Sequence, residues 1–199
     1  MSFTVRRPVR ALTALLAVVL AVGIAAAPAS AHHHKSGSGF GATTLTLDPG
    51  AVAALTSLGV TPAPIAPARA TASGALAFPI TNSLGSALRS GQIRHSGGIS
   101  LTAGSTTVAL TDFTIDLVQG RLTALVGGSR VPILSLDLSR ARVRARRGAL
   151  AIGPVGASLT DTAATALNAA FGLPAGTVPA GLKLGDATVR YRLFGGWRH

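Results

Sequence analysis

The chain has 199 residues, 18 of them Lys or Arg and six of them acidic, and it contains no cysteine. This length suits one domain with a sizeable core. The lack of cysteine excludes disulfides, thiolate metal sites and cysteine nucleophiles. All six acids are aspartates, and without glutamate the chain has few groups for proton transfer, so we predict that it is not an enzyme.

The N-terminal residues carry the pattern of a secretory signal peptide. Three arginines precede an uncharged apolar run over residues 11–27, and Ala29, Ser30 and Ala31 supply the small residues of a cleavage site. We predict a signal peptide over residues 1–31 and a secreted, extracellular protein. The competing interpretation is a membrane anchor, but the run is shorter than the roughly 20 residues that span a bilayer. No later run is long enough to do so.

Residues 32–41 are rich in His, Ser and Gly, and we predict that they form a mobile leader. Cleavage after Ala31 would make His32, His33 and His34 the first three residues. A free α-amine, two deprotonated backbone amides and the imidazole of the third residue form a square-planar nitrogen set, which suits Cu(II) and Ni(II). The sequence therefore offers a metal site at this terminus, with an incidental polar leader as the alternative.

The folded domain is predicted to span residues 42–199 and to begin with a strand at 43–47. Asp48 and Pro49 then indicate the start of a helix over 49–58, because Asp favours the N-cap and Pro the first helical position. The apolar face expected for this helix consists of Val52, Leu55 and Leu58.

A proline-rich segment and a run of strands follow this helix. The prolines in 61–67 exclude a helix or a central strand, so we expect a surface connector there. Alternating apolar residues and glycine-containing turns then predict antiparallel strands. Their ranges are 75–80, 92–95, 99–103, 106–118, 121–126, 131–138, 140–146 and 149–155. Within 106–118 the apolar positions change parity near Thr111 and Asp112, which requires a bulge.

A second helix is predicted over 161–171, capped by Thr160 or Asp161 and ended by Gly172. Its buried stripe is expected to be Ala163, Leu167 and Phe171. A strand at 187–193 completes the domain. These elements predict a mainly β fold, a single antiparallel β-sandwich or flattened barrel with two short helices.

Motifs for catalysis are missing from the sequence. Asp112 and Asp116 would lie on one strand face roughly 13 Å apart, whereas the paired carboxylates of a glycosidase need about 5 to 9.5 Å. No G-x-S-x-G elbow, H-E-x-x-H motif or phosphate-binding loop occurs.

Residues 140–146 form an arginine-rich segment. In a strand, one face would carry a ladder of arginines and the other face would turn Val143 and its alanine neighbours toward the core. The ladder consists of Arg140, Arg142, Arg144 and Arg146. Guanidinium groups bind carboxylate and phosphate, so the ladder suits an acidic cell-wall polymer or haem propionates, with a solvated outer face as the alternative. Nucleic acid is not expected, because few aromatic residues are available for stacking and the protein is predicted to be exported. A turn or a second bulge should lie near Ser139, where the apolar parity changes.

Several segments between Gly74 and Gly172 resemble HtaA-type domains. They are GALAFPI at 74–80, GQIRHSGGI at 91–99, LTDF at 110–113 and SLT at 158–160 ahead of an Ala-rich helix. HtaA-type domains are secreted or surface β domains of actinobacteria used in haem uptake. The resemblance implies that His95 is the histidine that supports a haem-ligating tyrosine. Tyr191 is the only tyrosine in the chain, so it is the candidate ligand.

From these observations we expect an exported, non-catalytic, HtaA-like β domain whose haem-binding role is retained, altered or lost. The alternative hypothesis is a structural or adhesive protein of the cell envelope that binds acidic wall polymers through the arginine ladder. Haem titration would support the first hypothesis, and salt-reversible binding to anionic wall material would support the second.

Overall fold

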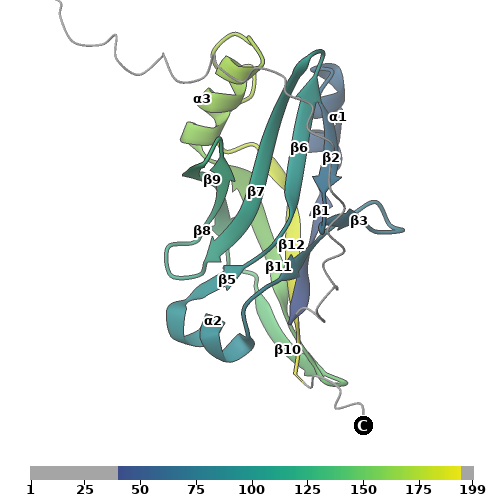
Figure 1. Cartoon of the computed structure of the whole chain (residues 1–199), viewed down its shortest axis with the longest axis vertical. Coiled ribbons are helices and arrows are strands. Elements are labelled where there is room, and N and C mark those ends of the chain that lie inside the picture. The colour runs from purple at the N-terminus through teal and green to yellow at the C-terminus, as the bar shows by residue number, and fades with distance from the viewer. Residues whose placement is uncertain (1–39, 194–199) are drawn as a thin grey trace, which may run out of the picture. The chain divides into compact units, whose positions relative to one another are not determined.

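The computed structural model describes residues 40–193, which form three helices and one twelve-stranded antiparallel sheet (Figure 1). The predicted signal peptide and the His32, His33 and His34 cluster lie outside these residues. The helices are α1 (Pro49–Ser57), α2 (Leu84–Ser90) and α3 (Asp161–Ala170). The strands are β1 (Gly41–Leu47), β2 (Thr61–Ile65), β3 (Arg69–Ala70), β4 (Leu76–Ile80), β5 (Gln92–Arg94), β6 (Gly98–Ala103), β7 (Thr106–Asp116), β8 (Arg121–Val126), β9 (Ser129–Asp137), β10 (Arg142–Arg146), β11 (Ala149–Leu159) and β12 (Lys183–Arg192).

The sheet curves into a nearly closed barrel. Hydrogen-bonded neighbours follow the order β5-β7-β8-β9-β11-β12-β1-β4. A bridge between His95, which follows β5, and Ile80 at the end of β4 then closes the path. Backbone bonds from Thr81 to Arg94 and from Ser96 to Pro79 complete this seam. The predicted mainly β fold, a flattened barrel, is therefore confirmed.

Each of two long strands pairs along one of its edges with two shorter strands, one after the other. β7 pairs with β6 along its first half and with β5 along its second half, and a register shift separates Thr111 from Thr114. β11 pairs with β10 and then with β9, with a register shift between Ile152 and Val155. The bulge predicted near Thr111 and Asp112 is thus confirmed, and Asp112 adopts a φ of 50° there.

Helices cover the two ends of the barrel. α1 and α3 lie at one end and α2 at the other (Figure 1). The core next to α1 and α3 includes Phe78 and Phe113, whose rings meet edge to face at 5.1 Å. The core next to α2 includes Ile93 and Tyr191. None of the helices within residues 40–193 has the length and apolar character needed to cross a bilayer.

Both predicted helices form with their expected caps. The Asp48 carboxylate accepts a hydrogen bond from the backbone of Gly50 at the start of α1, and the Thr160 hydroxyl accepts one from Ala163 at the start of α3. Val52 was placed on the buried face of α1, but its side chain is 44% exposed, and Ala51 is buried instead. The prediction for Val52 was wrong because the stripe of α1 that packs on the barrel runs through Ala51, Leu55 and Leu58, at i, i+4 and i+7, and Val52 lies beside it.

Two segments differ from the sequence prediction. α2 was missed, although Ser83 caps its N-terminus and Gly91 ends it in the left-handed region. Residues 61–65 are not a plain connector but the edge strand β2, which pairs with β6. Pro62 and Pro64 are tolerated because an edge strand leaves alternate backbone N–H positions facing solvent.

Candidate functional site

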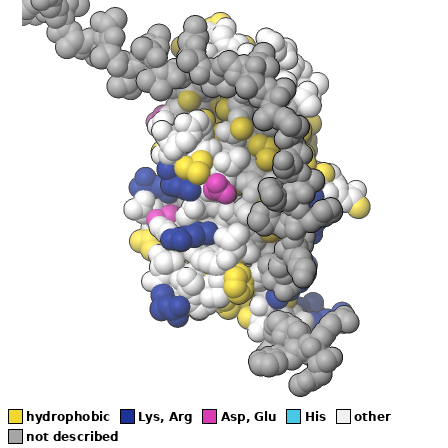
Figure 2. All heavy atoms as spheres, in the orientation of Figure 1, with side chains coloured by type: hydrophobic (Ala, Val, Ile, Leu, Met, Phe, Trp, Pro, Cys, Tyr) yellow, Lys and Arg dark blue, Asp and Glu magenta, His cyan; other side chains and the backbone are white. Residues whose placement is uncertain are grey.

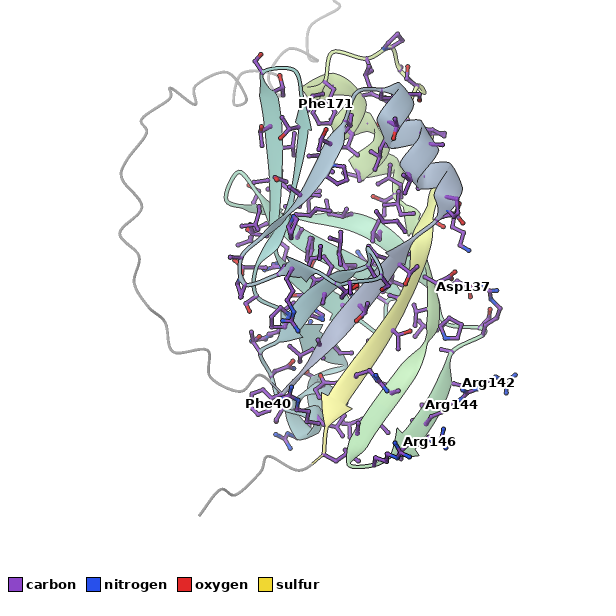
Figure 3. The ribbon with its side chains drawn as sticks, turned by 90° about the vertical axis from the view of Figure 1, so that its right-hand side faces the viewer. Phe40, Asp137, Arg142, Arg144, Arg146 and Phe171 are labelled. Carbon is purple, nitrogen blue, oxygen red and sulfur yellow. The ribbon has the colours of Figure 1, made fainter. Side chains whose placement is uncertain are left out.

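The barrel encloses an apolar cavity of about 150 Å³. Side chains from most strands line it, together with residues of α1 and α3 such as Leu55 and Phe171. Figure 3 shows Phe171 at the end of the barrel where these two helices lie. Thr43 and His95 are the polar side chains among the lining residues, and the others are aliphatic, aromatic or proline. This cavity is the candidate ligand site because its lining is almost wholly apolar and comes from the interior of the barrel.

His95 is 5% exposed and makes two side-chain hydrogen bonds. Its Nδ1 lies 3.1 Å from the carbonyl oxygen of Phe113, and its Nε2 lies 2.7 Å from the hydroxyl of Thr43. Because a carbonyl can only accept, Nδ1 carries the proton and Nε2 accepts the Thr43 hydroxyl. One imidazole therefore joins β1 to β7 beside the seam that closes the barrel.

Burial lowers the pKa of His95 to about 4, because the apolar surroundings disfavour imidazolium. His95 is accordingly neutral at pH 7. The hydroxyl, imidazole and carbonyl follow the order found in a nucleophile-base pair, but an imidazole with so low a pKa is a weak base at neutral pH. The arrangement is better suited to a fixed polar contact than to proton transfer.

Tyr191 lies on β12 and is 1% exposed. Its hydroxyl has no hydrogen-bond partner within residues 40–193, and burial raises its pKa to about 12. His95 bridges Ile80, Ile80 pairs with Gly41, and Gly41 pairs with Tyr191, so three strand spacings separate the two candidate residues. His95 lines the cavity and Tyr191 does not. The structure therefore does not bring the two predicted haem-binding residues together in one site.

The structure places three of the four arginines of the predicted ladder on one strand and the fourth in a turn. Arg142, Arg144 and Arg146 lie on β10 and are exposed, whereas Arg140 lies in the turn before β10. Figure 3 shows the three β10 arginines projecting away from the barrel. The Arg140 guanidinium is 3.7 Å from the carboxylate of Asp186. The turn predicted near Ser139 is present, with a backbone bond from Ala141 to Leu138.

Val143 was predicted to face the core, but it is 67% exposed. The reason is that, among residues 40–193, β10 pairs only with β11 and extends past the packed part of the barrel, so no second layer from these residues covers either of its faces. A period of two predicts which residues share a face, but it does not tell whether any layer covers that face.

One basic side chain on another outer face, that of Arg130, has hydrogen-bond partners. Arg130 donates hydrogen bonds to the carbonyl of Asp112 and to the hydroxyls of Thr114 and Thr123. Figure 2 shows basic and acidic side chains interspersed on one face of the molecule.

Within residues 40–193 no three His, Asp or Glu side chains gather to hold a metal ion. The predicted metal site at His32, His33 and His34 falls outside these residues.

Comparison with solved structures finds a match to the C-terminal domain of HtaA from Corynebacterium glutamicum. The match has 13% sequence identity and a TM-score of 0.52, and it covers 77% of this chain and 98% of that domain. No family model matches the chain. No curated protein matches it either. At this level of identity the likeness shows a shared fold.

Proposed function

We propose that this protein is a non-catalytic binding domain with an HtaA-like fold, and that it holds a small apolar molecule inside the barrel. The observation that carries the proposal is the cavity of about 150 Å³, lined by apolar side chains with Thr43 and His95 as its polar pair. A dry apolar cavity of about this volume admits a molecule the size of benzene. The Thr43 hydroxyl keeps a free acceptor position, so a ligand with one hydroxyl gains a hydrogen bond there.

Haem does not fit the residues predicted to hold it. Both ring nitrogens of His95 already have hydrogen-bond partners, and the hydroxyl of Tyr191 is buried outside the cavity. With a pKa of about 12, Tyr191 is a phenol at neutral pH. We therefore infer that the haem-binding role implied by the resemblance is altered in this chain. A haem titration should give no Soret shift that depends on His95.

Benzene and phenol test the cavity, because they differ by one hydroxyl. We expect both to raise the melting temperature in a saturable way, and phenol to bind more tightly. Ala157→Leu should abolish the effect, because Ala157 is buried and lines the cavity. Ala109→Leu is the matched control, because Ala109 is exposed on β7.

If Ala157→Leu does not fold, Ala187→Val replaces it in the test, because Ala187 lines the same cavity and valine adds less volume than leucine. The proposal fails if neither compound gives a saturable shift, or if cavity-filling variants bind as well as wild type. A Soret shift lost in His95→Ala would instead restore the haem-binding role.

We place this domain outside the cell on the strength of the predicted signal peptide over residues 1–31. Mass spectrometry of secreted protein should find His32 as the first residue. One equivalent of Cu(II) should then give the visible band of square-planar nitrogen coordination. His34→Ala or acetylation of the terminus should remove that band. Retention of residues 11–27 in a membrane fraction would contradict this proposal.

A further inference from the structure

The register of three neighbouring strands places two columns of arginines on one outer face. Residues directly opposite each other in an antiparallel pair project from the same face. The rows are Arg144, Ala151 and Arg190, then Arg146, Ala149 and Arg192, with Arg142 opposite Gly153. Val189 and Tyr191, the alternate residues of β12, are buried in the barrel, so the arginines of β12 point outward.

The floor between these columns consists of small residues. β11 contributes Ala149, Ala151 and Gly153, which leave no bulky side chain between β10 and β12. With strands about 4.8 Å apart, the two columns are about 10 Å apart at the backbone, and successive arginines on a strand are about 6.7 Å apart. We call this surface the arginine trough. It consists of Arg142, Arg144, Arg146, Ala149, Ala151, Gly153, Arg190 and Arg192.

The charges of the arginine trough are not compensated within residues 40–193. None of its five arginines forms a salt bridge there, and all five are exposed. Carboxylates stand at one end only: Asp137 and Asp186 both lie opposite Gly156. Arg140 and Lys183 already pair with Asp186. Two columns of like charge that flank a strand without charges create a positive potential between them, which attracts an anion to that strand.

We propose that the arginine trough binds an extended anionic polymer that lies along β11 between the two columns. Guanidinium forks bind phosphate and carboxylate in the same bidentate way, so the shared chemistry is an anionic group repeated along a chain. Among the described residues the floor offers only Ala and Gly and no aromatic ring for base stacking, so the proposed polymer is not a nucleic acid. The carboxylates beside Gly156 limit the bound length to the three arginine registers.

Binding to labelled poly(glycerol phosphate), to polygalacturonate and to oligothymidylate, measured across a salt series, tests the proposal. We expect Arg144→Ser combined with Arg190→Ser to weaken binding of the preferred polymer about tenfold and to reduce the salt dependence by about two ionic contacts. The matched control is Arg69→Ser combined with Arg121→Ser, which removes the same charge from exposed positions elsewhere. It should change binding less than twofold. The first two polymers identify whether phosphate or carboxylate is preferred.

Ala151→Leu separates a shaped site from general attraction to a basic protein. It changes no charge but fills the floor, so we expect it to weaken binding as strongly as the double arginine variant, whereas Ala151→Ser should bind normally. Circular dichroism shows whether each variant is folded. Equal loss in both double variants with no effect of Ala151→Leu would overturn the proposal. Tightest binding to oligothymidylate would overturn the choice of polymer.

Discussion

The two places where a long strand changes partners have the same backbone layout and opposite surroundings. β7 passes from β6 to β5, and β11 passes from β10 to β9, each with a register shift toward the strand on its other edge. At the β7 junction His95 is buried and bonded on both ring nitrogens. At the β11 junction every residue of β10 is exposed.

The difference in burial between the two junctions depends on whether other strands cover the shorter strand. β5 leads into the bridge with Ile80 on β4, so its inner face is covered by the rest of the barrel. β10 leads into a two-residue turn at Arg147 and Gly148, both with positive φ, and returns on β11, and no layer formed by residues 40–193 covers it. The same device therefore closes the barrel in one place and projects a charged hairpin in the other. At the β7 junction the buried polar groups support the fold. At the β11 junction the charges are exposed and can contact a partner.

Removing the imidazole gives the sharpest test of the β7 junction. His95→Ala should lower the free energy of unfolding by about 4 kcal/mol, because it leaves a cavity and removes the bonds to Thr43 and Phe113. Urea unfolding followed by circular dichroism measures this loss. A loss below about 1 kcal/mol would mean that backbone bonds alone close the seam.

Acid should weaken the same junction. The pKa of His95 is about 4 in the folded protein and 6.5 when unfolded. Between these values the unfolded chain binds a proton that the folded protein does not, so stability falls as the pH drops from above 6.5 through 4. The loss is about 3 kcal/mol. Unfolding measured at pH 7 and pH 4 should show it in wild type and not in His95→Gln. The same loss in both proteins would assign the acid sensitivity to other groups.

Much of the fold could be predicted from sequence because its signals are local. Glycine-containing turns, alternating residues and helix caps predicted most strands, two helices and the bulge at Asp112. α2 was missed because it has seven residues and little apolar pattern, although Ser83 and Gly91 mark its ends. The path of the sheet depends on pairings distant in sequence, such as β1 with β12, which no local pattern contains.

The candidate site was predictable only in part for the same reason. His95 was singled out, but its partner Thr43 lies 52 residues away on β1. The arginines of β10 were found from their spacing, whereas Arg190 and Arg192 join them only through the shared neighbour β11. Val143 shows the converse: the alternation of its strand was predicted correctly, but no layer within residues 40–193 covers its side chain.

Thr43→Val gives a smaller change at the β7 junction because it keeps the shape of the side chain. It leaves Nε2 of His95 without a donor in an apolar cavity, which should cost about 1 to 2 kcal/mol. Thr44→Val is the control, because Thr44 is the next residue of β1 and points to the other face. Equal losses in the two variants would show that the bond to His95 is not what stabilises the seam.

Val143→Asp should have the smallest effect, since it changes a residue of β10 that is 67% exposed. A carboxylate there stays in water, so we expect the free energy of unfolding to change by no more than about 0.5 kcal/mol. Ile152 lies opposite Val143 on β11 and packs against the core beside α2, so Ile152→Asp should destabilise the protein strongly because it buries a charge without a partner. Thermal melts of the two variants compare neighbouring strands on one face. Strong destabilisation by Val143→Asp would mean that a layer covers this face of β10 in solution, and β10 would then resemble β5 rather than contrast with it.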